Sequence, residues 1–152
     1  MVAGGATRAA SVGAALRALD RECRIVLVHD AARPFVPRET IDAVIQTAAA
    51  GQGALAALRV TDTLKRGDPN GRVLQTMDRS ELWRAQTPQG FPRDVLEAAY
   101  RQIADGSNET ATDDAELVER AGFPVILVPD SSANIKITTP DDFRLAEALA
   151  AS

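Results

Sequence analysis

Residues 23–34 read CRIVLVHDAARP, and this stretch decides the expected fold. Its first half, from Cys23 to Val28, is a short β-branched run without alternation, which is typical of a strand buried on both faces. The run stops at residues 29–34, and Pro37-Arg38-Glu39-Thr40 predicts the start of a helix. A buried strand followed by a helix indicates an α/β layer fold.

The same alternation continues on both sides of this stretch. Before it, apolar residues from Val12 to Leu19 recur at helical spacing, with Ser11 as a candidate N-cap. After it, the sequence predicts strands near 54–60, 125–128 and 134–138, and helices that follow 91–92, 112–114 and 139–140. We therefore expect one α/β domain over residues 1–152 with a mostly parallel sheet.

Residues 61–83 interrupt this alternation. The segment KRGDPNG at 65–71 is rich in turn-forming residues and joins two short extended pieces. The sequence therefore predicts a protruding β-hairpin arm here, and not another strand–helix unit.

Composition excludes several classes of protein. The 152 residues match one domain, and 17 basic against 21 acidic residues leave a net charge of −4, with no overall attraction to nucleic acid or anionic membranes. One cysteine and one histidine exclude an internal disulfide and a cysteine/histidine zinc site. No apolar run reaches the ~20 residues that span a bilayer, and no signal-peptide pattern opens the chain. A cytoplasmic protein is expected.

Asp30 and Arg33 are the first candidate site residues, because ligands bind at the carboxyl ends of strands in open α/β sheets. Two small alanines separate them and leave room for a ligand. Asp30 suits a Mg²⁺ ion that a phosphate also coordinates, and Arg33 suits bidentate binding of phosphate. A structural alternative is that Asp30 caps the following turn and pairs with Arg33.

Other polar residues also have a functional and a structural interpretation. Lys136 interrupts a strand-like segment, where it either supplies a cation or points outward. Thr87 and Thr112 lie at junctions between loop and helix; N-capping alone explains Thr112, although helix starts also favour anions. His29 has no partner for a metal site or a nucleophilic triad. Arg79 in the arm is by itself an ordinary surface charge.

Short motifs follow one another in a fixed order along nearly the whole chain. They are GGATR at 4–8 with Ser11-Val12, VHDAARP at 28–34, TDTLK at 61–65, Asp78-Arg79, Leu82-Trp83, QTPQ at 86–89, Phe91, TDD at 112–114, NIKIT at 134–138 and PDD at 140–142. In this order they resemble the 2-C-methyl-D-erythritol 4-phosphate cytidylyltransferase family of non-mevalonate isoprenoid biosynthesis.

The resemblance implies a Rossmann-like nucleotidyltransferase fold that binds CTP and Mg²⁺ and forms a homodimer by exchanging arms. The implied reaction transfers CMP from CTP to 2-C-methyl-D-erythritol 4-phosphate and gives 4-diphosphocytidyl-2-C-methyl-D-erythritol and pyrophosphate. A substrate phosphate oxygen attacks the α-phosphorus in line, so no enzyme nucleophile is needed. Alignment and charge neutralisation then account for catalysis.

The resemblance also implies roles for individual residues. Asp30 matches the family's metal and substrate carboxylate, and Lys136 matches the cation that stabilises charge at the α-phosphate. The implied acceptor-binding residues are Arg33, Thr63 and Arg79, the last two from the partner's arm, with Thr87 and Thr112 lining the same pocket. Gly5 and Ser11 match positions that contact cytosine and ribose.

The resemblance has one departure, at the front of the chain. Family members begin with a strand and a glycine-rich loop whose amides and cations hold the triphosphate. The sequence has no matching segment, so we expect a truncated or incompletely recorded member that lacks the first βαβ portion, with exposed sheet edges and weak or no turnover. Two alternatives are a ribitol 5-phosphate cytidylyltransferase and a non-catalytic remnant that dimerises through the arm.

Overall fold

A four-stranded mixed sheet forms the centre of the computed structural model, which describes residues 1–104 and 111–151. In spatial order its strands are β1 (Ile25–Val28), β5 (Trp83–Pro92), β2 (Gly53–Arg59) and β6 (Val125–Pro129). β5 runs antiparallel to both β1 and β2, and only β2 and β6 pair in parallel. The α/β class is confirmed, but the prediction of a mostly parallel sheet was wrong.

The error comes from β5, a central strand that the sequence pattern does not predict. Pro88 and its polar neighbours hide it, because a proline normally removes a hydrogen bond from a strand ladder. In the structure, the register between β2 and β5 shifts between Leu55 and Ala57, and residues 86–88 have no pairing partner in either neighbouring strand. Pro88 therefore removes no ladder hydrogen bond.

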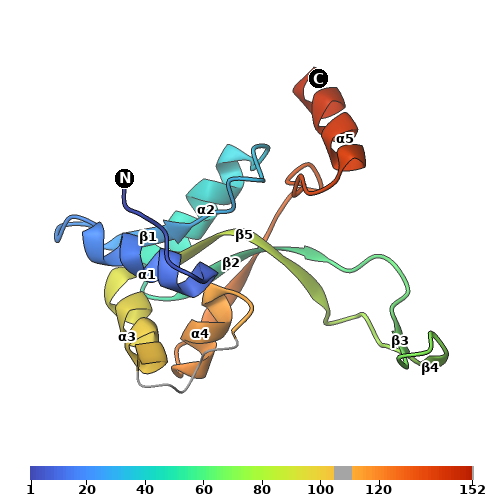
Figure 1. Ribbon diagram of the computed structural model, residues 1–152, viewed down its shortest axis with the longest axis horizontal. Coiled ribbons are helices and arrows are strands. Elements are labelled where there is room, and N and C mark those ends of the chain that lie inside the picture. Colours follow the sequence, from blue (N-terminus) through green and yellow to red (C-terminus); the bar gives the residue numbers. More distant parts are fainter. Residues whose placement is uncertain (105–110, 152) are drawn as a thin grey trace.

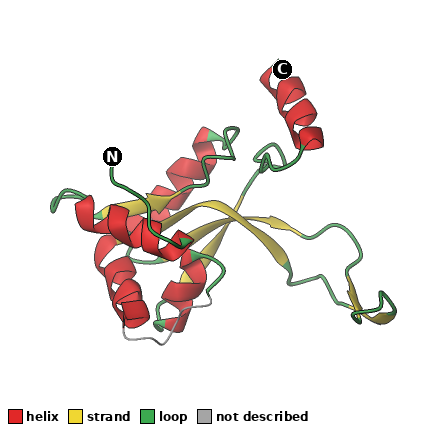
Figure 2. Ribbon diagram, in the orientation of Figure 1, coloured by secondary structure: helices red, strands yellow, loops and turns green. Residues whose placement is uncertain are grey.

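Helices cover both faces of this sheet (Figures 1 and 2). One face carries α1 (Arg8–Ala18), α3 (Arg93–Ala104) and α4 (Asp114–Arg120), and the other carries α2 (Arg38–Ala49). Phe91, Leu96 and Val118 are buried in the first layer, and Val44 is buried in the second. Each such side chain contributes about 1.5–3 kcal/mol by leaving water, so these two layers stabilise the sheet that carries the site.

Side-chain caps define three helix starts. Thr7 caps α1 by accepting a hydrogen bond from the Ala10 N–H, so this helix starts before the predicted Ser11. Asp113, and not Thr112, caps α4 by accepting from the Glu116 N–H. Thr139 caps α5 (Pro140–Ala150), the helix predicted after 139–140, by accepting from the Asp142 N–H. In each case the cap oxygen satisfies a backbone donor that the helix leaves unpaired.

Residues 134–138 form no strand, contrary to the prediction. The Ile137 N–H donates instead to the Ala32 carbonyl oxygen at 2.8 Å, so the segment is bonded to the loop that follows β1. The strand-like pattern around Lys136 therefore belongs to a segment that is held by this loop and not by a strand ladder.

The predicted hairpin is present and extends away from the sheet as a long arm (Figures 1 and 2). Its tip pairs β3 (Lys65–Gly67) with β4 (Val73–Thr76). Val73 and Leu74 are 57% and 55% exposed, which is unusual for adjacent large apolar residues. None of the helices in the described ranges is long and apolar enough to cross a membrane.

Gly90 tests how tightly β5 packs against α2. A Cβ at Gly90 would lie 2.5 Å from the Val44 side chain and 2.9 Å from that of Leu27. Because Val44 is fully buried and cannot move aside, we expect Gly90→Ala to lower the free energy of unfolding by about 1–3 kcal/mol. Urea denaturation measures this change, with Gly67→Ala as the control, since a Cβ there meets only ordinary contacts at 3.5 Å. Equal stability of the two variants would contradict the described packing.

Asp142 gives a second test, in the capping box of α5. Backbone and hydroxyl hydrogen bonds from Thr138 and Thr139 lower the pKa of Asp142 from 3.8 to about 2. Because the folded pKa lies below the unfolded one, the carboxylate stabilises the helix start above pH ~4 and this contribution is lost as the pH falls towards 2. Carbon NMR should find the Asp142 carboxyl titrating lower in the folded chain than in urea; identical values would disprove the capping role.

Candidate active site

Asp30 lies between two cations at the carboxyl end of β1. The Lys136 Nζ is 3.0 Å from the Asp30 Oδ2, and the Arg33 Nε is 3.6 Å from the same oxygen. The Arg33 side chain is mostly buried, and its second contact is a hydrogen bond to the Asn134 carbonyl oxygen at 2.8 Å. The structure thus brings together three of the candidate site residues, Asp30, Arg33 and Lys136.

Asn134 holds the segment that carries Lys136 against the sheet. Its side chain is fully buried, and its Nδ2 donates to the Thr87 carbonyl oxygen at 2.8 Å and to the Asp130 carboxylate at 2.5 Å. Asp130 also accepts from the Thr40 hydroxyl of α2. The two hydrogen bonds of the Asn134 Nδ2 tie the segment before Lys136 to β5 and to the residue after β6, and Asp130 ties that residue to α2, so these elements together place Lys136.

Thr87 and His29 support the Asp30 loop. The Asp30 N–H donates to the Thr87 Oγ1 at 3.0 Å, and the His29 Nδ1 is 3.0 Å from the same hydroxyl. The His29 Nε2 lies 2.9 Å from the Arg33 carbonyl oxygen, which can only accept, so Nε2 carries a proton. In the neutral imidazole the Nδ1 accepts from the Thr87 hydroxyl, and His29 thus links the Asp30 loop to β5.

Five of the predicted residues line one cavity of about 270 Å³: Asp30, Arg33, Thr87, Thr112 and Lys136. A second cavity, of about 280 Å³, shares Arg33 and Lys136 with the first and adds Arg84 and Asp142. The two cations therefore face both spaces, which is the arrangement needed to contact two anionic ligands at once.

The cations also control the ionisation of Asp30. Burial on its own would raise the pKa of Asp30, but the hydrogen bond and charge of Lys136, together with the charges of Arg33 and Arg8, hold the pKa below its usual value. Asp30 is therefore an anion at neutral pH, and it is suited to accept hydrogen bonds or bind a cation rather than donate a proton.

Four predicted residues lie outside the lining of these cavities. The Gly5 N–H donates to the Ser11 Oγ at 3.0 Å, so these two residues lie together at the start of α1. Thr63 and Arg79 are exposed on the arm. Within the single described chain, the arm residues do not meet the Asp30 group.

Several residues with no predicted role belong to the site region, and three of them have polar side chains that matter below. Arg8 and Gln89 line the first cavity, and Asn134 supports it. Gln89 is buried; its Nε2 donates to Asp113, and its Oε1 accepts from the Ala115 N–H. In the sequence, each of these residues is a polar side chain among small or apolar neighbours. That pattern points to a site only when the burial of the side chain is known.

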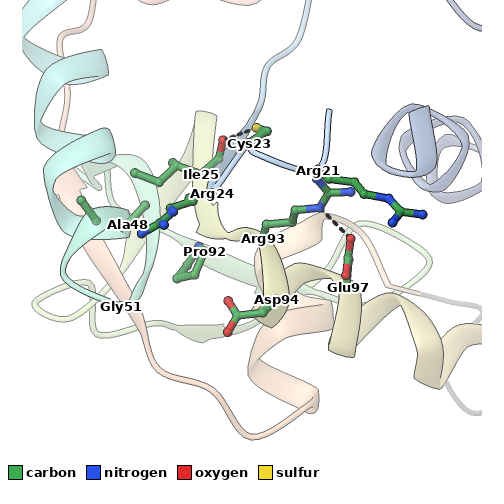
Figure 3. A pocket seen from close by; sticks show the side chains of 11 residues that line it. Arg21, Cys23, Arg24, Ile25, Ala48, Gly51, Pro92, Arg93, Asp94 and Glu97 are labelled. Carbon is green, nitrogen blue, oxygen red and sulfur yellow. Dashed lines mark hydrogen bonds and ion pairs between the residues drawn. The ribbon is translucent and has the colours of Figure 1, made fainter. Parts of the chain in front are cut away.

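The largest cavity described, about 660 Å³, lies at a different place, beside the start of β1 and α3 (Figure 3). Figure 3 shows the side chains of Arg21 and Arg24 pointing away from each other, while Arg93 pairs with Glu97 at 2.7 Å. Its cations do not converge on one point, and it contains none of the predicted site residues.

The acidic residues near the cavity could bind a metal ion through one carboxylate but not through a cluster of protein ligands. Among residues 1–104 and 111–151, no three His, Cys, Asp or Glu side chains cluster as a metal site. Two carboxylates, Asp30 and Asp113, line the cavity beside its cations. Asp113 already accepts hydrogen bonds from the Glu116 N–H and the Gln89 Nε2, which leaves Asp30 as the carboxylate for an ion. This donor set suits Mg²⁺ held by one carboxylate together with ligand phosphates and water, because that ion seldom needs an all-protein cage.

Comparison with known proteins confirms the resemblance. The sequence profile of the 2-C-methyl-D-erythritol 4-phosphate cytidylyltransferase family matches residues 1–152. Relatives of that name from Symbiobacterium thermophilum and Roseobacter denitrificans are 51% and 48% identical, and the matches cover 98% of this chain in both cases. The crystal structure of the enzyme of that name from Thermus thermophilus superposes with a TM-score of 0.89 at 40% identity, covering 99% of this chain and 72% of that one.

The chain spans less than two thirds of the length of these curated relatives, 63% of the first and 65% of the second. The match nevertheless extends over the whole sequence and includes every strand and helix described above. The chain therefore belongs to the 2-C-methyl-D-erythritol 4-phosphate cytidylyltransferase family.

Proposed function

We propose that this chain takes part in the transfer of CMP from CTP to 2-C-methyl-D-erythritol 4-phosphate, with release of pyrophosphate. The observation that carries the proposal is the pair of cavities that share Lys136 and Arg33. A reaction between two phosphate-bearing substrates requires cations that contact both, since the negative charges otherwise repel each other as they approach. The names of the relatives give the acceptor and the cytidylyl group that is transferred, and CTP is the donor that the family resemblance implies.

In this mechanism the protein aligns the reactants and neutralises charge. Lys136 stabilises the charge that develops at the α-phosphate as an oxygen of the acceptor phosphate attacks it, and Arg33 orients that acceptor phosphate. Thr87 and Thr112 line the same cavity and supply hydroxyls for hydrogen bonds. The described residues provide no nucleophilic triad here, in agreement with direct in-line transfer.

Asp30 is the residue that would hold Mg²⁺. The ion, when bound, neutralises phosphate charge and polarises the phosphate that is attacked. Asp30 is ionised, lies within the cavity and is already oriented by Lys136 and Thr87. It therefore presents a fixed carboxylate oxygen without further rearrangement.

The remaining predicted contacts form part of the same proposal. Residues 1–152 act as one Rossmann-like cytidylyltransferase unit, in which Gly5 and Ser11 contact cytosine and ribose. The arm at 61–83 exchanges with a second copy, so that Thr63 and Arg79 reach the partner's acceptor cavity. The exposed Val73 and Leu74 support this, because burying adjacent apolar residues favours association.

Lys136 and Asp30 test the reaction. With CTP, Mg²⁺ and 2-C-methyl-D-erythritol 4-phosphate, this chain fused to a relative's glycine-rich front segment should release pyrophosphate. In that fusion, Lys136→Ala or Asp30→Asn should lower kcat by about 100-fold or more, because each removes a charge at the reacting phosphates. Arg38→Ala is the matched control, since Arg38 is exposed on α2 and pairs only with Asp42 among the described contacts.

Two outcomes would contradict the proposed reaction. Pyrophosphate release that is unchanged in both variants would remove the catalytic roles. Faster consumption of ribitol 5-phosphate than of methylerythritol phosphate would show that the acceptor is wrong.

The arm gives a test of the proposed dimer. We expect the unsubstituted chain to sediment as a dimer, and Val73→Asp with Leu74→Asp to produce monomers, because a buried charge without a partner opposes association. Sedimentation equilibrium measures the change, and Val2→Asp is the control at another exposed apolar position. A monomer before substitution, or a dimer that survives it, would exclude the arm as the interface.

A further inference from the structure

Arg8 is a third cation of the first cavity, and a buried acid holds it in place. It lies in the first turn of α1, and its Nη2 is 2.6 Å from the Oδ2 of Asp114 in α4. The Asp114 side chain is 0% exposed, whereas that of Arg8 is 41% exposed. The pair thus has a buried acidic end and an open basic end.

Tyr100 is hydrogen-bonded to the other carboxylate oxygen of Asp114. Its hydroxyl donates to the Asp114 Oδ1 at 2.5 Å, from α3. Burial and the Asp114 charge raise the pKa of Tyr100 strongly, so the phenol keeps its proton and remains a donor. With one oxygen bonded to Arg8 and the other to Tyr100, the carboxylate has a fixed orientation. Three helices therefore set the position of one guanidinium.

The open end of Arg8 lies in the cavity that contains Asp30 and Lys136. Asp30 and Arg8 are close enough for each to shift the pKa of the other. A guanidinium has five N–H donors, and within the described ranges one of them is assigned to Asp114. A guanidinium held on one side and open on the other is suited to bind phosphate oxygens with its remaining donors.

We propose that Arg8 binds a phosphate group in this cavity, and that Asp114 and Tyr100 are the positioning residues that aim it. The inference rests on the proposed function, because it assumes that a nucleotide or a sugar phosphate enters the cavity. The recognised group is the same in both cases, a phosphate that carries negative charge.

Calorimetric titration of the full chain with CTP, CMP and 2-C-methyl-D-erythritol 4-phosphate, each with Mg²⁺, tests the inference. Arg8→Met should weaken at least one ligand about tenfold or more, as expected for loss of a hydrogen bond between charged groups. Weaker binding of CTP but not CMP identifies the outer phosphates, weaker binding of both nucleotides identifies the α-phosphate, and weaker binding of the sugar phosphate alone identifies the acceptor. Arg38→Met controls for the loss of one positive charge.

A double variant keeps the test valid if Arg8→Met fails to fold with Asp114 unpaired. Arg8→Met combined with Asp114→Asn removes both charges and leaves no buried carboxylate without a partner. Asp114→Asn alone should weaken the same ligand about threefold, and it should add nothing in the Arg8→Met background, because Asp114 acts through Arg8. A purely structural Asp114 would change the unfolding midpoint in both backgrounds and leave the affinity unaltered.

The inference and the proposed function can fail separately. If Lys136→Met weakens CTP or sugar phosphate binding while Arg8→Met, alone or in the double variant, binds all three ligands within twofold of the unsubstituted chain, the role of Arg8 is wrong and the proposed site stands. If the unsubstituted chain binds none of them, both are wrong.

Discussion

Asp30 joins three parts of the chain at one point, two through its carboxylate and one through its backbone, and the rest of the site depends on this. It attracts Lys136 from the segment after β6 and Arg33 from its own loop, and its backbone N–H is bonded to Thr87 of β5. Partial burial makes these attractions stronger than they would be in water. Without the acid, two cations would face each other across a small space with no charge to balance them.

The sequence predicted the local units of the fold well, because each has its own local signal. The apolar run before His29, the proline before α2 and the capping box at Thr139 and Asp142 all act over a few residues. Sheet order does not have such a signal. β5 combines a proline with polar side chains, and only its contacts with β1 and β2 make those residues part of a strand. The direction of the sheet was therefore the part that local patterns could not reveal.

The site residues also divide into those with a local signal in the sequence and those without one. Asp30, Arg33 and Lys136 were recognisable because charged residues beside buried runs are uncommon and the motifs were ordered as in the family. Asn134 and Asp114 were not recognisable in this way. Both are fully buried and work through hydrogen bonds to residues distant in the sequence, Asn134 to Thr87 and Asp114 to Arg8 and Tyr100. Long-range partners decide whether a buried polar group is satisfied, and they appear only in three dimensions.

One strand carries both the root of the arm and a wall of the cavity. β5 begins at Trp83, beside the arm, and continues to Thr87 and Gln89. Side chains alternate between the faces of a strand, so one residue inserted between the arm and Thr87 would turn Thr87 away from Asp30 unless the strand bulged. Changes in arm length are therefore tolerated at the turn around Gly71, where the insertion leaves the register of β5 unaltered. The reach of the arm can therefore change while the spacing from its root to Thr87 and the Asp30 loop stays constant.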